Sequence, residues 1–291
     1  MQRRLRLIAW SRGLLAMLML PAADLFYGID GGLFHDDNVS RAQPGPDAVG
    51  DSGVNANAAL GMAYALGERG TLALSANLRL AQYQRFHGLD MAALGGTLSY
   101  RGKFGLGAYA LRLSLNGSLA AESYADSVRN GLRSRVWAEL AQRLSPRWDV
   151  STGIAADRFH DDNVQPLLPQ LSGDAFGISG RSLYARADYA LSERWQVTLG
   201  ASARRGEVVS SSRPNDEVFE YSSAVAVDPA FGPGYFAYKL AGRTGGAKLG
   251  ASVALSAHAS LNFGLARDVT RSEGGLEYRN NIGNATFVYS Y

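Results

Sequence analysis

From about Asp24 to the C-terminus, hydrophobic and polar residues alternate with a period of two. Between positions 71 and 80 the even positions hold leucine or alanine, and the odd positions hold mainly small polar residues and Arg79. A helix would spread these leucines around its whole circumference, whereas a strand places them on one face. The same alternation recurs near Leu111–Leu115, Trp195–Leu199 and Leu261–Leu265. We therefore predict an all-β chain.

Strands of soluble β-sandwiches also alternate hydrophobic and polar residues, so further features must decide between a barrel and a sandwich. The polar faces carry small residues and occasional arginines, as a water-filled interior would. The last seven residues, 285–291, place aromatic side chains at alternate positions and end on Tyr291. This ending resembles the terminal strand by which outer-membrane barrels are recognised by their barrel-assembly machinery. These features favour a transmembrane antiparallel up-and-down β-barrel.

Short and long links between the predicted strands alternate, as periplasmic turns and outer loops do in such barrels. Short links are expected near 67–70, 101–103, 144–147, 191–194 and 256–258, and long ones near 40–54, 85–91, 120–131, 160–180, 209–234 and 271–276. This spacing predicts twelve strands, with starts near 24, 55, 71, 92, 106, 132, 148, 181, 195, 236, 259 and 277. Fourteen strands are the alternative, if Gly245 and Gly246 divide the segment 235–256. Trp148 and Trp195, each just after a short turn, are expected in an interfacial aromatic girdle.

Residues 1–23 have the layout of a cleaved secretory signal: a basic start, the apolar run 13–20 and a small-residue exit. The barrel domain is then 24–291, and we expect it in the bacterial outer membrane, in contact with outer-membrane lipid and lipopolysaccharide. The formal net charge is +3, but four arginines lie within the first twelve residues. Without them the charge is slightly negative, which argues against a nucleic-acid-binding surface. The chain has no cysteine and no cofactor signature, so thiolate metal sites are excluded.

A hexapeptide, Phe-His-Asp-Asp-Asn-Val, occurs twice, at 34–39 and at 159–164. Both copies lie where a predicted strand enters a long outer loop. Carboxylates beside an asparagine suit a hard cation or a saccharide. The alternative is a strand end in which Asp and Asn side chains satisfy freed backbone groups. The residues concerned are Asp36, Asp37, Asn38, Asp161, Asp162 and Asn163.

Basic residues recur on the face opposite the leucines, which we assign to the lumen. They form a candidate pathway for anionic solutes, as charged rings do in channels. In the alternative, they form salt bridges with inward acids and close a narrow barrel. We expect Arg79, Arg112 and Arg135 at comparable heights. The inward bases are Arg79, Arg112, Arg133, Arg135, Arg143, Arg186 and Arg204, with Lys239 and Lys248 assigned more weakly, and the inward acids are Asp30, Glu139, Asp149, Asp157, Asp188 and Asp268.

No catalytic motif of the hydrolase, zinc-peptidase or nucleotide-binding kind is found. A lipid-modifying barrel enzyme would need a serine activated by a histidine on the bilayer side. We therefore expect a protein without catalytic residues.

The strand end Asp-Asp-Asn-Val and the segment 276–281, Leu-Glu-Tyr-Arg-Asn-Asn, resemble proteobacterial outer-membrane barrels of the porin-like kind. More loosely, they resemble the barrel part of surface lipoprotein assembly modifiers. The resemblance implies a small pore for anionic or saccharide solutes, or an accessory of surface polysaccharide. The alternatives are a non-conducting barrel whose outer loops bind a partner, and a lipid-modifying enzyme.

Overall fold

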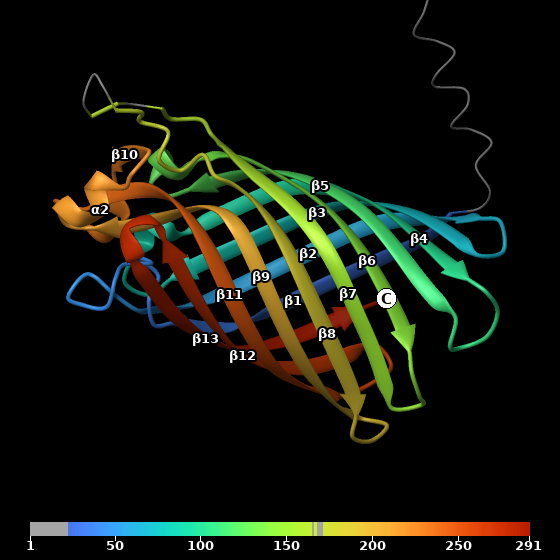
Figure 1. Ribbon diagram of the computed structural model, residues 1–291. Helices are drawn as coiled ribbons and strands as arrows, with labels where there is room; N and C mark the ends of the chain where they lie inside the picture. Colours follow the sequence, from blue (N-terminus) through green and yellow to red (C-terminus); the bar gives the residue numbers. More distant parts are fainter. Residues whose placement is uncertain (1–22, 165, 168–170) are drawn as a thin grey trace, which may run out of the picture.

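The computed structural model describes residues 23–164, 166–167 and 171–291. They form a single tilted barrel of antiparallel strands, with long loops gathered at one end and short turns at the other (Figure 1). We call these the outer end and the inner end. The strands are β1 (Asp24–Asp36), β2 (Asp51–Leu66), β3 (Gly70–Tyr83), β4 (Met91–Phe104), β5 (Leu111–Tyr124), β6 (Gly131–Arg143), β7 (Trp148–Asp161), β8 (Ser179–Ala190), β9 (Trp195–Ser212), β10 (Ala224–Val227), β11 (Phe236–Ala254), β12 (Ala259–Ser272) and β13 (Glu277–Ser290).

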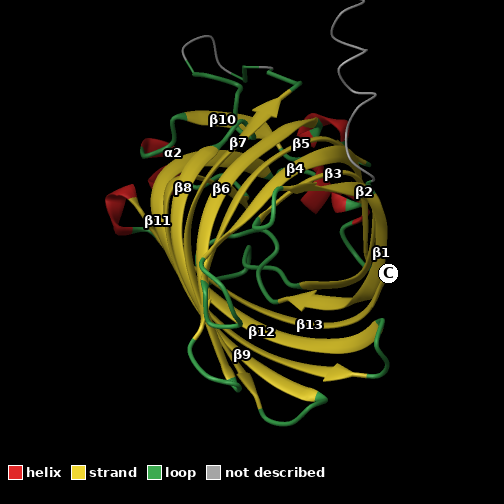
Figure 2. Ribbon diagram, turned by 90° about the vertical axis from the view of Figure 1, so that its right-hand side faces the viewer, coloured by secondary structure: helices red, strands yellow, loops and turns green. Residues whose placement is uncertain are grey.

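Among the described residues, every strand except β10 belongs to the barrel wall. Each wall strand pairs with its neighbours in sequence order, β9 pairs with β11, and β13 pairs with β1 to close the ring (Figure 2). The short β10 lies within the loop 213–235 and pairs with the outer end of β11. The prediction of a twelve-stranded antiparallel barrel is confirmed.

The residues that alternate in the sequence lie on the two opposite faces of the barrel wall. Leucines such as Leu94 and Leu265 point away from the lumen and are more than 60% exposed, as a lipid-facing surface requires. Trp148 and Trp195 are also exposed on this face, directly beside inner turns. Both tryptophans therefore lie on the outward face beside the inner turns, and their place in an interfacial girdle stays a prediction.

The C-terminal aromatics help to hold the ring closed. The backbone groups of Tyr27 and Tyr291 exchange two hydrogen bonds, of 3.0 and 2.9 Å, and their rings stack at 5.6 Å. His258, in the turn between β11 and β12, lies 5.3 Å from the Tyr291 ring. The two ends of the described chain therefore meet at the inner end of the barrel.

Some boundary predictions were wrong. The second strand begins at Asp51 rather than near 55. The turn predicted at 101–103 lies at 105–110, and the fifth strand begins at Leu111 rather than near 106. Gly105 and Gly107 have positive φ angles of 112° and 84°, so they bend the backbone at this turn.

The fourteen-strand alternative was also wrong, because β11 runs unbroken through Gly245 and Gly246. Gly246 is paired with both Ser202 and Asp268, and a β-carbon there would lie 2.5 Å from the Asp268 carboxylate. This glycine therefore makes room for inward side chains and does not end the strand.

The predicted signal peptide lies, apart from Ala23, outside the described residues. None of the described helices is long and apolar enough to cross a membrane.

Candidate solute pathway

The lumen contains three cavities in series. An outer chamber of about 480 Å³ lies beneath the long loops, a middle cavity of about 1000 Å³ follows, and an inner vestibule of about 610 Å³ opens among the short turns. The outer chamber and the middle cavity share Arg133, Asp157, Arg204, Thr244 and Asp268 in their walls. The middle cavity and the vestibule share Arg186. The cavities therefore adjoin one another along the barrel axis.

The middle cavity has an excess of positive charge. Its wall includes two acids, Asp157 and Asp268, and five bases: Arg133, Arg135, Arg186, Arg204 and Lys248. Within the described residues, neither Arg135 nor Lys248 has a carboxylate within salt-bridge distance. The Arg135 guanidinium instead lies 5.3 Å from the Trp137 ring. Two positive charges are therefore available to a solute in this cavity.

Arg79 and Arg133 meet one buried carboxylate near the outer end. Both guanidinium groups donate to Glu122 Oε1 at 2.6 Å, and Tyr124 donates its hydroxyl to Oε2 at 3.1 Å. Glu122 is only 4% exposed. This carboxylate was not among the inward acids predicted from the sequence, although its position in the alternation of β5 places it on the lumen face.

Arg112 does not lie level with Arg79 and Arg135, so that prediction was wrong. The register sets Arg79 at the level of Glu122, ten residues from Arg112 on β5. That separation is about 33 Å along the strand. Arg112 lies at the inner end instead and binds Asp149 at 2.6 Å.

The remaining predicted bases have different surroundings. Arg186 binds Asp188 at 2.8 Å, and Arg204 binds Asp157 at 3.1 Å, both on the lumen side. Lys239 is not in the wall of any of the three cavities, because it is buried at the outer end of β11 and binds Asp174 at 3.2 Å. The weaker assignment of Lys239 to the lumen was therefore wrong.

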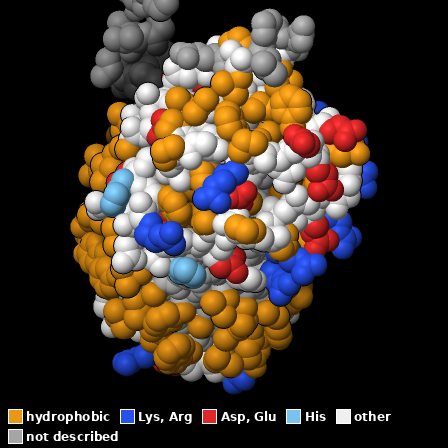
Figure 3. Space-filling model, turned by 90° about the vertical axis from the view of Figure 1, so that its left-hand side faces the viewer, with side chains coloured by type: hydrophobic (Ala, Val, Ile, Leu, Met, Phe, Trp, Pro, Cys, Tyr) orange, Lys and Arg blue, Asp and Glu red, His pale blue; other side chains and the backbone are white. Residues whose placement is uncertain are grey.

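The loop 213–235 forms a cap across the outer end. It contains the short helix α2 (Asp216–Glu220), β10 and the 3-10 turn η4 (Pro229–Phe231). Phe231 packs against Phe86 and Leu89 of the β3–β4 loop, with Val39 and Val49 of the β1–β2 loop beside them. Figure 3 shows side chains filling this end of the barrel. The cap thus joins loops from opposite sides of the ring.

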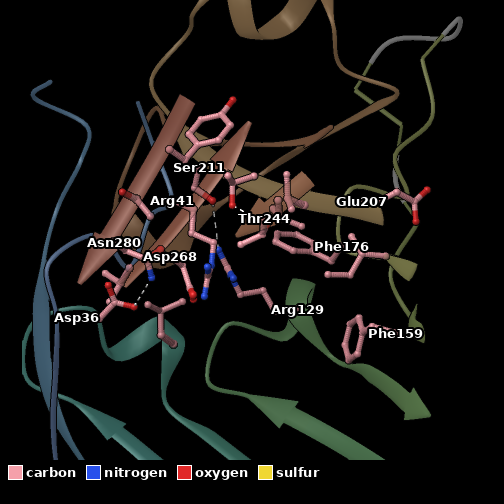
Figure 4. Close-up of a pocket in the computed structure, with 18 of the residues that line it drawn as sticks. Asp36, Arg41, Arg129, Phe159, Phe176, Glu207, Ser211, Thr244, Asp268 and Asn280 are labelled. Carbon is pink, nitrogen blue, oxygen red and sulfur yellow. Dashed lines mark hydrogen bonds between the residues drawn. The ribbon is translucent and has the colours of Figure 1, made fainter. Parts of the chain in front are cut away.

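A buried ion pair fastens the cap to the β5–β6 loop. Asp228 is fully buried and accepts from Arg129 Nε at 3.1 Å and from Arg129 Nη2 at 2.5 Å. Ser211 donates to the same carboxylate, and the Arg129 guanidinium lies 4.7 Å from the Phe176 ring. Figure 4 shows the Arg129 side chain directed toward Ser211, to which it also donates. Sequence reasoning missed both charged residues because they lie in loops, where alternation carries no signal.

Asp126 is next to this ion pair. Its side chain accepts from the Val128 backbone N–H at the start of the 3-10 turn η3 (Ser127–Arg129). Burial raises the pKa of Asp126 above its usual value, and the nearby Asp228 carboxylate adds to the rise. The β5–β6 loop, to which the cap is fastened, therefore carries a carboxyl whose charged form is destabilised.

Both copies of the hexapeptide have the same local geometry. Asp36 accepts from the Asn38 backbone N–H at 2.9 Å, and Asp161 accepts from the Asn163 backbone N–H at 2.8 Å. These are Asx turns that lead the chain out of a strand. Asn38 also donates to two backbone carbonyls, whereas Asn163 donates to one.

The other acidic residues of the two hexapeptides, Asp37 and Asp162, differ in their contacts. Asp37 accepts from Asn281 at 2.6 Å, and Asp162 is exposed. In the described part of the chain, no group of three histidine or acidic side chains converges as a metal site requires. The contacts therefore account for both repeats as strand ends.

One histidine and one serine meet on the outward face. His35 Nδ1 lies 2.9 Å from Ser52 Oγ, between directly opposed residues of β1 and β2. Across the described residues, no side chain hydrogen-bonds the other ring nitrogen of His35. An activated serine needs its histidine oriented by such a group, so this contact is incomplete as a catalytic pair.

Comparison with solved structures gives the fold class. An outer-membrane channel of Pseudomonas putida matches over 94% of this chain and 97% of its own, with a TM-score of 0.55 and 14% sequence identity. This chain has the fold of an outer-membrane β-barrel. An anion-selective porin of Comamonas acidovorans matches at 93% and 99% coverage, with a TM-score of 0.44 and 8% identity. No protein-family model matches the sequence, and no curated protein matches it either.

Proposed function

We propose that this barrel is an outer-membrane channel for anionic solutes, acidic saccharides among them. The observation that carries the proposal is the middle cavity of about 1000 Å³, with five basic and two acidic side chains in its wall. A cavity with this charge excess attracts anions and repels cations. The outward leucines and the fold support a location in the outer membrane.

The lumen is not closed by salt bridges throughout its length. Ion pairs lie near the two ends, at Glu122 and at Asp149. The wall of the middle cavity also holds the pair Arg204–Asp157, but Arg135 and Lys248 face this cavity, and no salt bridge reaches either of them from the described residues. This distribution favours a conducting barrel over a purely structural one. The cap over the outer chamber implies that conductance is limited at the outer end.

The test is the reversal potential of the refolded protein in a planar bilayer under a salt gradient. We expect anion preference in the wild type and a clear loss of it in the double variant Arg135→Gln/Lys248→Gln. A matched control is Arg147→Gln/Arg194→Gln, which removes two charges from exposed inner turns outside these cavities. A folded wild-type barrel that stays silent would overturn the channel, and equal selectivity in all three proteins would overturn the role of the middle cavity.

Liposome swelling distinguishes solute classes in the same proteins. Acidic oligosaccharides should enter faster than neutral ones of equal size, and the lumen double variant should abolish the difference. Equal rates for acidic and neutral sugars in the wild type would contradict a charge-selective pathway.

A further inference from the structure

Seven arginines lie on the outward face of six consecutive wall strands, near the outer end. They share this face with exposed leucines such as Leu183 and Leu265, so they point away from the lumen. All seven are exposed. They are Arg158 on β7, Arg181 on β8, Arg205 on β9, Arg243 on β11, Arg267 and Arg271 on β12, and Arg279 on β13.

Four of these arginines form a row across adjacent strands. Arg181 is directly opposite Arg205, Arg205 is opposite Arg243, and Arg243 is opposite Arg271. Like charges directly opposite one another destabilise a sheet, because their β-carbons are only about 5 Å apart. Such a row therefore needs an anion to offset its repulsion.

Acids of the protein supply little of that compensation. Glu277 binds Arg271 at 3.0 Å and Arg279 at 2.5 Å, at one end of the row. Glu207, the next acid on β9 beyond Arg205, lines the outer chamber and is 3.7 Å from Lys239. In the part of the chain that the structure describes, no salt bridge reaches Arg181, Arg205 or Arg243. The middle of the row is thus without a carboxylate.

The height of the row matches the edge of the apolar belt. On the outward face of β9, the positions from Trp195 to Ala203 are apolar, and Arg205 follows. Ten residues at about 3.3 Å each, on a strand tilted by about 40°, span roughly 25 Å along the barrel axis. This equals the usual height of the apolar band, so Arg205 lies at the headgroup level of the outer leaflet.

The row is confined to one side of the barrel. Outward positions near the outer ends of β1 to β6 hold no lysine or arginine. Figure 3 shows charged side chains, basic and acidic together, along one flank of the outer end and mainly hydrophobic side chains along the opposite flank. A general attraction to an anionic surface would not require this alignment on one flank.

We propose that this arginine row binds the phosphate groups of a phosphorylated glycolipid in the outer leaflet, the lipid A part of lipopolysaccharide. Phosphate matches the guanidinium fork in geometry and accepts two hydrogen bonds from it. The exposed leucines below the row would contact the acyl chains. The inference rests on the outer-membrane location proposed above, but not on conduction.

The test is a titration of the detergent-purified barrel with lipopolysaccharide, read by native mass spectrometry. We expect the double variant Arg205→Gln/Arg243→Gln to bind phosphorylated lipopolysaccharide at least about tenfold more weakly, since losing charge-assisted contacts has an effect of that order. The control Arg147→Gln/Arg194→Gln removes the same charge at the inner end and should bind as the wild type does. Phosphatase-treated lipopolysaccharide should bind all three proteins equally and weakly.

The outcomes separate this inference from the channel proposal. Anion selectivity in the bilayer should be unchanged in Arg205→Gln/Arg243→Gln, because both side chains lie outside the lumen. Equal affinity of wild type and variant for the phosphorylated lipid would overturn the inference, as would an equal loss in the control. Full displacement of the lipid by inorganic phosphate alone would also overturn it, by assigning the row to a free anion.

Discussion

The substitution Asp228→Asn should loosen the cap at the outer end. The Asp228 carboxylate is fully buried, and its partner Arg129 has a side chain only 16% exposed. Removing one member of a buried ion pair leaves the other charge uncompensated and costs about 3 to 5 kcal/mol. At about 1.4 kcal/mol per factor of ten, the lower figure shifts the closed-to-open equilibrium of the cap by about two orders of magnitude.

Chymotrypsin cleavage at Phe231 reads this equilibrium directly. Phe231 is 7% exposed in the closed cap, whereas Tyr221 in the same loop is 37% exposed and serves as an internal reference. When opening is fast relative to cleavage, the cleavage rate follows the open population. We expect cleavage at Phe231 to rise about a hundredfold in Asp228→Asn while cleavage at Tyr221 changes little. Single-channel conductance should rise as well.

A double variant separates the ion pair from other effects of the substitution. In Arg129→Met/Asp228→Asn the charge is absent from both positions, and methionine still packs against Phe176 and Phe231. This protein should be closer to the wild type than Asp228→Asn alone. Asp216→Asn, in an exposed position of α2, is the control. Unchanged cleavage at Phe231 and unchanged conductance in folded Asp228→Asn would refute the idea that this pair holds the cap.

Three further predictions concern Asp126, Asn38 and Glu122. The pKa of Asp126 is raised in the folded protein, so its charged form weakens the attachment of the cap at pH values above that pKa. The weakening disappears as the pH falls towards about 4, the pKa of an aspartate in the unfolded chain. Asp126→Asn should therefore slow proteolysis of the cap at pH 7 and make its rate depend less on pH. Asn38→Ala should lower the midpoint of heat-induced unfolding on gels more than Asn163→Ala does, because the Asn38 side chain makes more hydrogen bonds. We expect Asn38→Ala to cost about 2 kcal/mol of stability. Equal midpoints, or the opposite order, would contradict the structural role of the first repeat. Glu122→Gln should lower the free energy of unfolding by about 2 kcal/mol. It should also increase anion preference, because it frees the guanidinium groups of Arg79 and Arg133. Unchanged reversal potentials would show that these arginines lie off the solute path.

The wall of the barrel was predictable because alternation and turn spacing are local properties of the chain. Ten of the predicted strand starts lie within two residues of those observed, and the other two are off by four and five residues. The larger of these errors, at Leu111, arose because Tyr109, which lies in a turn, is in phase with the alternation of Leu111 and Leu113. Alternation cannot distinguish a strand from a turn that is itself partly apolar.

The lumen was predictable in part. Alternation shows which side chains point into the lumen, but it does not give their height along the barrel or their ion-pair partners. Arg135 and Lys248 lie where the sequence put them, in the wall of the middle cavity. Arg112 was placed at the wrong height, because height depends on the register between strands. The cap was not predictable at all, since Arg129 and Asp228 lie 99 residues apart in irregular segments.

Alternation also contained a signal that was overlooked, the adjacent pair Arg204 and Arg205. Two consecutive residues of a strand point to opposite faces, so one of the pair had to lie outside the lumen. Arg204 faces inward, lies against Gly180 and binds Asp157 at 3.1 Å. Arg205 faces outward, where no salt bridge reaches it from the described residues. The difference has a physical reason: a partly enclosed charge needs a partner within the protein, whereas a charge at the edge of the apolar belt can be matched by a lipid phosphate. In the two proposals made here, the inner arginines are paired or available to a solute, and the outer row is available to a lipid phosphate.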